Sequence, residues 1–157
     1  MNAFGSLLVE GLVVVLPRFV LRRLFPPNKV SKEIRIELKG ESPLQVQLDA
    51  KPPRIELYFA VTNLSHFDLV LDRFLFDLWF GQPTLTGSVL RRVPIASRAA
   101  ARDLYCRLPL SSGQVAQIQE FIAKPGAMGG IHLYATAYFE SKIGVLEVEE
   151  RIERNKI

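Results

Sequence analysis

Residues 55–80, IELYFAVTNLSHFDLVLDRFLFDLWF, decide the fold of this chain. Apolar side chains occupy every second position from Ile55 to Val61, and again from Phe74 to Phe80. An alternation of period two is typical of a β-strand that buries one face. Asn63 lies between the two runs, in a segment that marks a turn. The stretch therefore predicts two successive strands of a sheet.

The same alternation continues on both sides of this stretch. Further apolar rows lie at residues 34–38, 44–48, 85–89, 93–95, 104–110, 131–139 and 145–152. Between the rows, Ser111 and Ser112 can cap a helix whose apolar stripe runs from Val115 to Ile122. We predict an all-β fold, an immunoglobulin-like antiparallel β-sandwich of about seven to eight strands, with one short helix before the last hairpin.

The first 25 residues differ in texture from the rest because they are almost wholly apolar. Roughly 20 apolar residues in a helix span a bilayer, and this segment is just long enough despite a central glutamate. Three interpretations fit: a single-pass anchor, a helix in the membrane interface or a larger membrane complex, and a cleaved secretory signal. We expect an N-terminal hydrophobic helix, residues 1–25, that anchors the chain in a membrane. The predicted anchor side chains are Phe4, Leu7, Leu8, Leu12, Val13, Val14, Val15, Leu16, Phe19 and Leu21.

Basic residues follow the apolar run, and none precedes it. The positive-inside rule then places the globular domain, residues 33–157, on the cytoplasmic side of the membrane. A basic, proline-containing linker, residues 26–32, joins it to the anchor. Anionic lipid headgroups attract basic side chains close to a span. The predicted headgroup contacts are Arg18, Arg22, Arg23, Lys29 and Lys32.

Four short motifs resemble a known family. They are LYFAVTN at 57–63, LVLDRFLFDL at 69–78, LTG at 85–87 and VPI at 93–95. Over residues 30–152 the chain resembles the late embryogenesis abundant type-two family, whose domain is also called the water-stress and hypersensitive-response (WHy) domain. That family usually places proline after the turn asparagine, where this chain has Leu64. The resemblance implies a sandwich fold, stress-linked non-catalytic roles and membrane association.

The sequence contains no pattern that indicates catalysis or a cofactor. His66 and His132 have no neighbouring ligand at metal-binding spacing, and the serines lack a nucleophile elbow. We therefore expect no enzyme, no metal, no cofactor and no small-molecule substrate. The single cysteine, Cys106, falls on an inward row, which predicts a small core residue.

Two segments of the domain could contact a partner. The basic stretch that begins at Arg91 favours either an anionic partner or the solvated side of an edge strand. We do not expect exposed aromatic residues for base stacking to be interleaved with this stretch, so we do not expect nucleic acid as a partner. Residues 74–80 are apolar on both faces apart from Asp77, so their outer side chains either form an interface or are covered by the chain itself. The predicted partner contacts are Glu10, Leu75, Trp79, Arg91 and Arg92.

Three functions are compatible with these features. The first is a non-enzymatic binding or scaffold module, attached to a membrane and acting through protein or lipid contacts. The second is an accessory subunit of a multi-protein membrane complex, with membrane lipid and other subunits as partners. The third is a stress-protective domain of the desiccation type, which needs no fixed partner.

Overall fold

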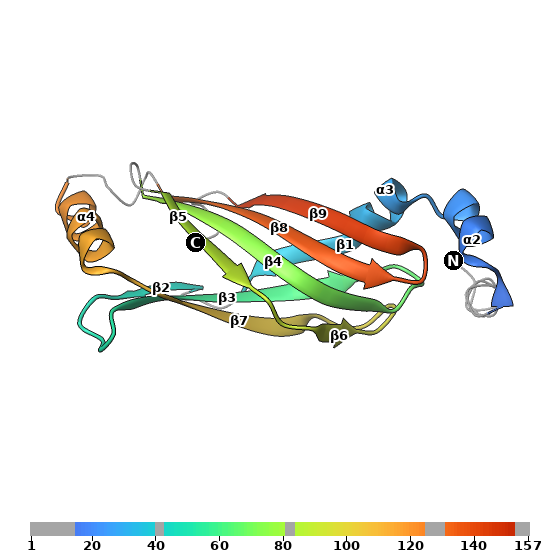
Figure 1. Cartoon of the computed structure of the whole chain (residues 1–157), viewed down its shortest axis with the longest axis horizontal. Helices are drawn as coiled ribbons and strands as arrows, with labels where there is room; N and C mark the ends of the chain where they lie inside the picture. Colours follow the sequence, from blue (N-terminus) through green and yellow to red (C-terminus); the bar gives the residue numbers. More distant parts are fainter. Residues whose placement is uncertain (1–14, 40–42, 81–83, 125–130, 153–157) are drawn as a thin grey trace.

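The computed structural model describes residues 15–39, 43–80, 84–124 and 131–152, and there the chain forms two antiparallel sheets stacked as an open sandwich (Figure 1). The four-stranded sheet contains β1 (Ile34–Leu38), β2 (Leu44–Gln47), β3 (Arg54–Asn63) and β7 (Arg102–Pro109). The five-stranded sheet contains β4 (Leu69–Phe80), β5 (Thr84–Val89), β6 (Val93–Ile95), β8 (Ile131–Ser141) and β9 (Gly144–Ile152). The predicted mainly-β architecture of two antiparallel layers is confirmed.

The two strands of the opening stretch, β3 and β4, are each central to one sheet. Strand β3 pairs with β1 and β2 along one side and with β7 along the other. Strand β4 pairs with β5 and β6 along one side and with β8 along the other, and β9 continues the sheet beyond β8. The edge strand β9 contacts β1 of the other sheet. On the opposite side of the sandwich, β7 faces the segment from β5 to β6.

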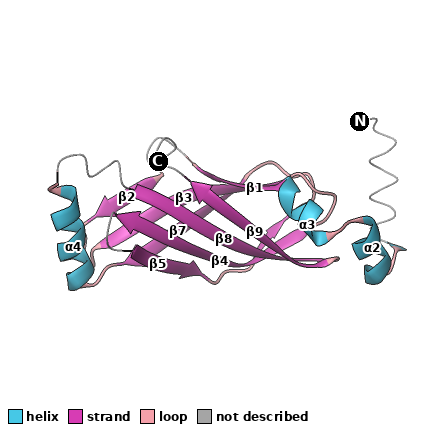
Figure 2. Ribbon diagram, turned by 90° about the horizontal axis from the view of Figure 1, so that it is seen from above, coloured by secondary structure: helices cyan, strands magenta, loops and turns pink. Residues whose placement is uncertain are grey.

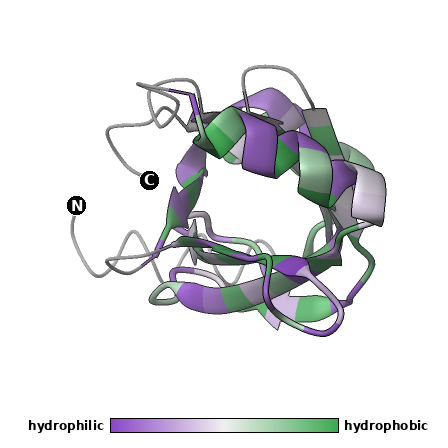
Figure 3. Cartoon of the chain, turned by 90° about the vertical axis from the view of Figure 1, so that its left-hand side faces the viewer, coloured by the Kyte–Doolittle hydropathy of each residue, from purple (hydrophilic) through white to green (hydrophobic). Residues whose placement is uncertain are grey.

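The inner faces of both sheets supply the core. Phe59 of β3 stacks on Phe74 of β4, with ring centroids 4.2 Å apart and planes inclined by 16°. Phe76 lies beside Phe74 in the same row, and all three rings are buried. Figure 3 looks along the long axis of the molecule and shows the two layers around the interior, with hydrophobic and hydrophilic residues alternating. The period-two pattern in the sequence thus corresponds to burial, as predicted.

The turn between β3 and β4 depends on a buried asparagine. The Asn63 amide donates to the carbonyl oxygens of Phe67 at 2.8 Å and Ala96 at 3.0 Å. Its oxygen accepts from the backbone N–H of Ser65 at 3.0 Å and from the Ser65 hydroxyl at 2.7 Å. The side chain thereby ties the turn to the segment after β6, which explains why it tolerates full burial.

Helices lie at the two ends of the sandwich (Figure 2). At one end, α4 (Ser112–Ile122) connects β7 to β8 and begins with a capping box between Ser111 and Gln114, so the predicted short helix is confirmed. At the other end lie α2 (Arg18–Leu24), α3 (Pro27–Val30) and a 3-10 helix (Ser31–Glu33).

The predicted single N-terminal transmembrane anchor is wrong. Among the residues that the structure describes, no helix is both long and apolar enough to cross a bilayer. Helix α2 has 7 residues and begins after Pro17, so the described part of the predicted anchor is short and interrupted. Leu21 is completely buried in the core of the sandwich, and Leu16 packs against that core. The other predicted anchor positions within the described residues, Val15 and Phe19, are exposed.

The rest of the predicted anchor lies outside the described residues: Phe4, Leu7, Leu8, Leu12, Val13 and Val14. Beyond α2, Phe25 packs edge-to-face against Phe67, with centroids 5.3 Å apart. The apolar pattern around residues 16–25 therefore reflects, in part, contact with the protein core. We inferred from this anchor that the chain is attached to a membrane with its globular domain on the cytoplasmic side. That inference is therefore not supported.

Candidate functional site

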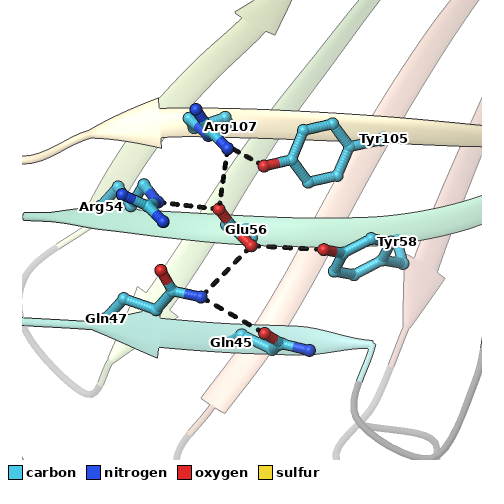
Figure 4. Close-up of polar contacts among 7 residues, drawn as sticks. All are labelled: Gln45, Gln47, Arg54, Glu56, Tyr58, Tyr105 and Arg107. Atoms are coloured by element: carbon cyan, nitrogen blue, oxygen red, sulfur yellow. Dashed lines mark hydrogen bonds and ion pairs between the residues drawn. The ribbon is translucent and has the colours of Figure 1, made fainter. Parts of the chain in front are cut away.

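The outer face of the four-stranded sheet carries a polar cluster around a buried carboxylate. Glu56 lies on the outer face of β3, yet only 5% of it is exposed. Register brings Gln45 of β2 to one side of Glu56 and Arg107 of β7 to the other. Figure 4 shows the surrounding side chains converging on the carboxylate from three adjacent strands. We call this group the Glu56 cluster; its members are Gln45, Gln47, Arg54, Glu56, Tyr58, Tyr105 and Arg107.

Every contact of the Glu56 carboxylate comes from a hydrogen-bond donor. Oε1 accepts from Arg54 Nε at 2.8 Å and lies 3.3 Å from a terminal nitrogen of Arg107. Oε2 accepts from the Tyr58 hydroxyl at 3.2 Å and from the Gln47 amide at 3.3 Å. Two guanidinium groups therefore share one carboxylate, so the cluster has a surplus positive charge. Hydrogen bonds with an ionised partner are among the stronger ones in proteins.

These contacts favour the ionised form of the carboxyl group. The pKa of Glu56 is lowered, first by the hydrogen bond from Arg54 and next by a hydrogen bond with Tyr105. The pKa of Tyr58 is raised, first by burial and then by the negative charge of Glu56. At neutral pH the Glu56 carboxyl group is therefore ionised, and the Tyr58 hydroxyl keeps its proton.

Tyr105 and Arg107 are exposed to solvent, Arg54 and Tyr58 are half-buried, and the carboxylate stays covered. Tyr58 and Tyr105 form a cross-strand pair with centroids 5.0 Å apart. Arg107 donates to the Tyr105 hydroxyl at 2.8 Å and lies 5.6 Å from the ring centroid. Tyr105 remains 43% exposed. The arrangement presents rigid groups for contact and contains no nucleophile paired with a base.

The residues that the sequence predicted as partner contacts do not form one site. Arg92 pairs with Glu140 of β8, which compensates its charge. Arg91 is exposed on the segment between β5 and β6. On the outer face of the five-stranded sheet, Leu75 is half-buried between neighbouring strands, whereas Trp79 is exposed. Glu10 lies outside the described residues.

The predicted headgroup contacts gather at the end of the molecule opposite α4. Arg18 and Arg22 place their guanidinium groups over Gly144, in the turn between β8 and β9, where φ is +123°. Arg23, Lys29 and Lys32 are exposed on α2, α3 and the 3-10 helix. Their contact with lipid stays a prediction.

Cys106 is buried on the inner face of β7, as predicted. Burial raises the pKa of its thiol to about 11, which keeps it protonated at neutral pH. Among the described residues, no group of three or more histidine, cysteine or acidic side chains could hold a metal ion.

The Glu56 cluster was missed because alternation assigns Glu56 and Tyr58 to a solvated face. The sequence feature that could have revealed it is a row of Arg54, Glu56 and Tyr58 on one face of β3. A second row, Tyr105 and Arg107, lies on one face of β7. Only the pairing of β3 with β7 brings these two sets together.

No protein-family model matches this sequence, and no curated protein matches it either. Similar folds occur among solved structures. A Northeast Structural Genomics Consortium target, SoR45, has a TM-score of 0.50 and 14% identity, covering 77% of this chain and 86% of its own. A protein from Archaeoglobus fulgidus has a TM-score of 0.45 and 13% identity, over 76% of this chain and 94% of its own. A protein provisionally assigned to the late embryogenesis abundant (LEA) class has a TM-score of 0.47 and 10% identity, over 98% of this chain and 89% of its own. At these identities the likeness to SoR45 concerns the fold alone.

Proposed function

We propose that this chain is a non-enzymatic binding domain that recognises a partner protein through the Glu56 cluster. The observation that carries the proposal is the burial of Glu56 beneath tyrosine and arginine side chains that remain exposed. Tyrosine and arginine are enriched among the residues that dominate binding energy at protein interfaces.

The buried carboxylate restrains these exposed groups before a partner arrives. Taking a carboxylate out of water is costly, and a well-packed apolar residue often stabilises a fold as much as a buried ion pair does. The sheet already has a separate apolar core, so the cluster is better explained by recognition than by folding. Side chains fixed in advance lose less conformational entropy on binding. We infer that Glu56 positions Arg107 and Tyr58, and that Arg107 positions Tyr105.

The chemistry of the cluster indicates the partner surface. Two guanidinium groups and one carboxylate leave one surplus positive charge, and the phenol rings offer flat apolar area with polar edges. A complementary surface carries an aspartate or glutamate beside apolar side chains.

A site-specific photocrosslinking experiment tests this proposal, with a matched control in the chain itself. Arg151 lies over the Tyr134 ring at 5.4 Å, on the outer face of the five-stranded sheet. This pair matches Arg107 and Tyr105 in composition and in the distance from guanidinium to ring, but it lies across two neighbouring strands. A photoreactive residue is placed at Tyr105 or at Tyr134, and both proteins are expressed in the organism of origin. We expect one defined adduct from position 105 and none of that mass from position 134.

The crosslinked partner is then purified, and its affinity for variants of the chain is measured. We expect Tyr105→Ala and Arg107→Gln each to weaken binding by about tenfold or more, as hot-spot residues do. Tyr134→Ala and Arg151→Gln should leave the affinity unchanged. Equal adducts from both positions, or equal losses in both pairs of variants, contradict recognition through the Glu56 cluster.

Stress protection is the second candidate, favoured by the resemblance of residues 30–152 to the late embryogenesis abundant type-two family. Such a domain protects other proteins without a fixed partner. It should suppress the aggregation of a test enzyme during drying, and Tyr105→Ala should protect as well as the unaltered chain. Protection no better than an equal mass of albumin counts against this function.

A further inference from the structure

A cavity of about 150 Å³ opens between the two sheets, on the side where β7 faces the segment from β5 to β6. We call it the β7 slot. Three of its apolar side chains, Phe59, Leu71 and Val93, are buried members of the core, so the slot reaches the interior of the sandwich. Val89 and Leu104 complete its apolar lining. Apolar cavities of this size accommodate benzene.

The other side chains that line the slot give it a positive charge. Arg91 and Arg102 both line it, and both residues are exposed. Arg102 shares the inner face of β7 with Leu104 and Cys106, an unusual place for a charged residue unless it meets solvent or a ligand. Within the described residues, neither guanidinium group pairs with a carboxylate. Asp103, which also lines the slot, pairs with Lys39 instead.

We propose that the β7 slot binds a small apolar carboxylate of about the size of benzoate. The ring would lie against Phe59 and Leu71, and the carboxylate would accept hydrogen bonds from Arg91 and Arg102. Guanidinium groups match a carboxylate with two parallel hydrogen bonds, and the apolar lining gains when the ring displaces water. This ligand site goes beyond the proposed protein-binding face, although Tyr105 borders both.

Titration of the full-length protein followed by ¹H–¹⁵N NMR tests the proposal. The probes are benzoate, benzyl alcohol and acetate, which separate the contribution of the ring from that of the charge. We expect saturable shifts for benzoate at amides around the slot, with a Kd between about 10 μM and 1 mM. Benzyl alcohol and acetate should bind at least about tenfold more weakly.

Variants then assign the contacts. Arg91→Gln and Arg102→Gln should each weaken benzoate binding by about tenfold, because each removes charged hydrogen-bond donors. The matched control is Arg92→Gln, which removes an adjacent arginine that pairs with Glu140 and does not line the slot. Val89→Phe, at a half-buried position of the lining, should fill the slot and abolish binding while the spectrum stays that of a folded protein.

Several outcomes would overturn the proposal. One is the absence of saturable shifts up to about 10 mM benzoate. The others are an affinity for benzyl alcohol equal to that for benzoate, and a loss of benzoate affinity in Arg92→Gln as large as that in Arg102→Gln. A preference for phenyl phosphate over benzoate by more than about tenfold would overturn the choice of a carboxylate. Benzoate binding that survives Tyr105→Ala, when partner binding does not, shows that the two sites act separately.

Discussion

The ring of Phe76 lies directly against the backbone of Gly87. The two residues face each other on β4 and β5, and both are buried. A Cβ added at Gly87 would lie 2.1 Å from Cζ of the ring and 2.6 Å from Cε1, closer than non-bonded carbon atoms approach. Phe76 therefore occupies its place in the core only because residue 87 has no side chain.

Gly87→Ala should lower the free energy of unfolding by about 1–3 kcal/mol, because the added methyl group overpacks the core. Urea unfolding followed by circular dichroism measures the change. Phe76→Leu should recover part of the loss in a double-mutant cycle, since the shorter side chain vacates the space over residue 87. Additive losses would mean that the methyl group meets something other than the Phe76 ring. Gly113→Ala, where nothing lies within 4 Å of the added carbon, is the matched control.

Asn63→Ala should destabilise the protein by about 2–4 kcal/mol, because it leaves buried polar groups of the β3–β4 turn without partners. Asn63→Asp should be at least as harmful: the carboxylate can still accept from Ser65, but it cannot donate to the carbonyls of Phe67 and Ala96. Thermal unfolding compares both variants with Asn28→Ala, which changes an exposed asparagine. A stable Asn63→Asp variant would show that the two donated hydrogen bonds contribute little.

Strand identity could be predicted from the sequence because the pattern of burial has period two. Ile55, Leu57 and Phe59 are buried, and the rows of β4 and β8 behave in the same way. The pattern describes one strand at a time, however. The burial of Glu56 depends on neighbours contributed by β2 and β7, and the β7 slot depends on two sheets leaving a gap. Neither can be inferred from a single strand.

The N-terminal segment shows a second limit of sequence patterns. Hydropathy alone does not distinguish an apolar side chain that faces lipid from one that faces a protein core. Leu21 belonged to the predicted anchor, yet it is buried in the sandwich. Pro17 was the available signal, because a helix begins immediately after it.

The Glu56 cluster should make the protein less stable as pH falls into the acid range. The pKa of Glu56 is lower in the folded protein than in the unfolded chain, where it is near 4.5. Its contribution is therefore complete above that value and is lost as pH falls through the lower, folded pKa. Glu56→Gln should remove this part of the acid dependence, so the difference in stability between the two proteins should shrink as pH falls. We expect urea unfolding at several pH values to show this.

Glu33→Gln, at an exposed position, is the control. A difference in stability between Glu56→Gln and the unaltered chain that does not depend on pH contradicts the role given to the Glu56 charge.

Cys106 should lower the stability of the protein as pH rises, whereas the contribution of Glu56 is lost as pH falls. Burial raises the pKa of its thiol from 9.0 to about 11, so the thiol ionises in the unfolded chain before it does so in the folded protein. Its contribution is complete below pH 9 and is lost as pH rises through about 11, by about 2 kcal/mol between pH 8 and 11. Cys106→Ala lacks this loss, although its small cavity lowers stability at every pH. Every other titratable group is present in both proteins, so the contributions of those groups cancel in the difference. Parallel stability curves for the two proteins across this range would mean that the thiol is accessible to water. In that case iodoacetamide should alkylate Cys106 without unfolding, whereas the buried thiol should react only when the sandwich opens.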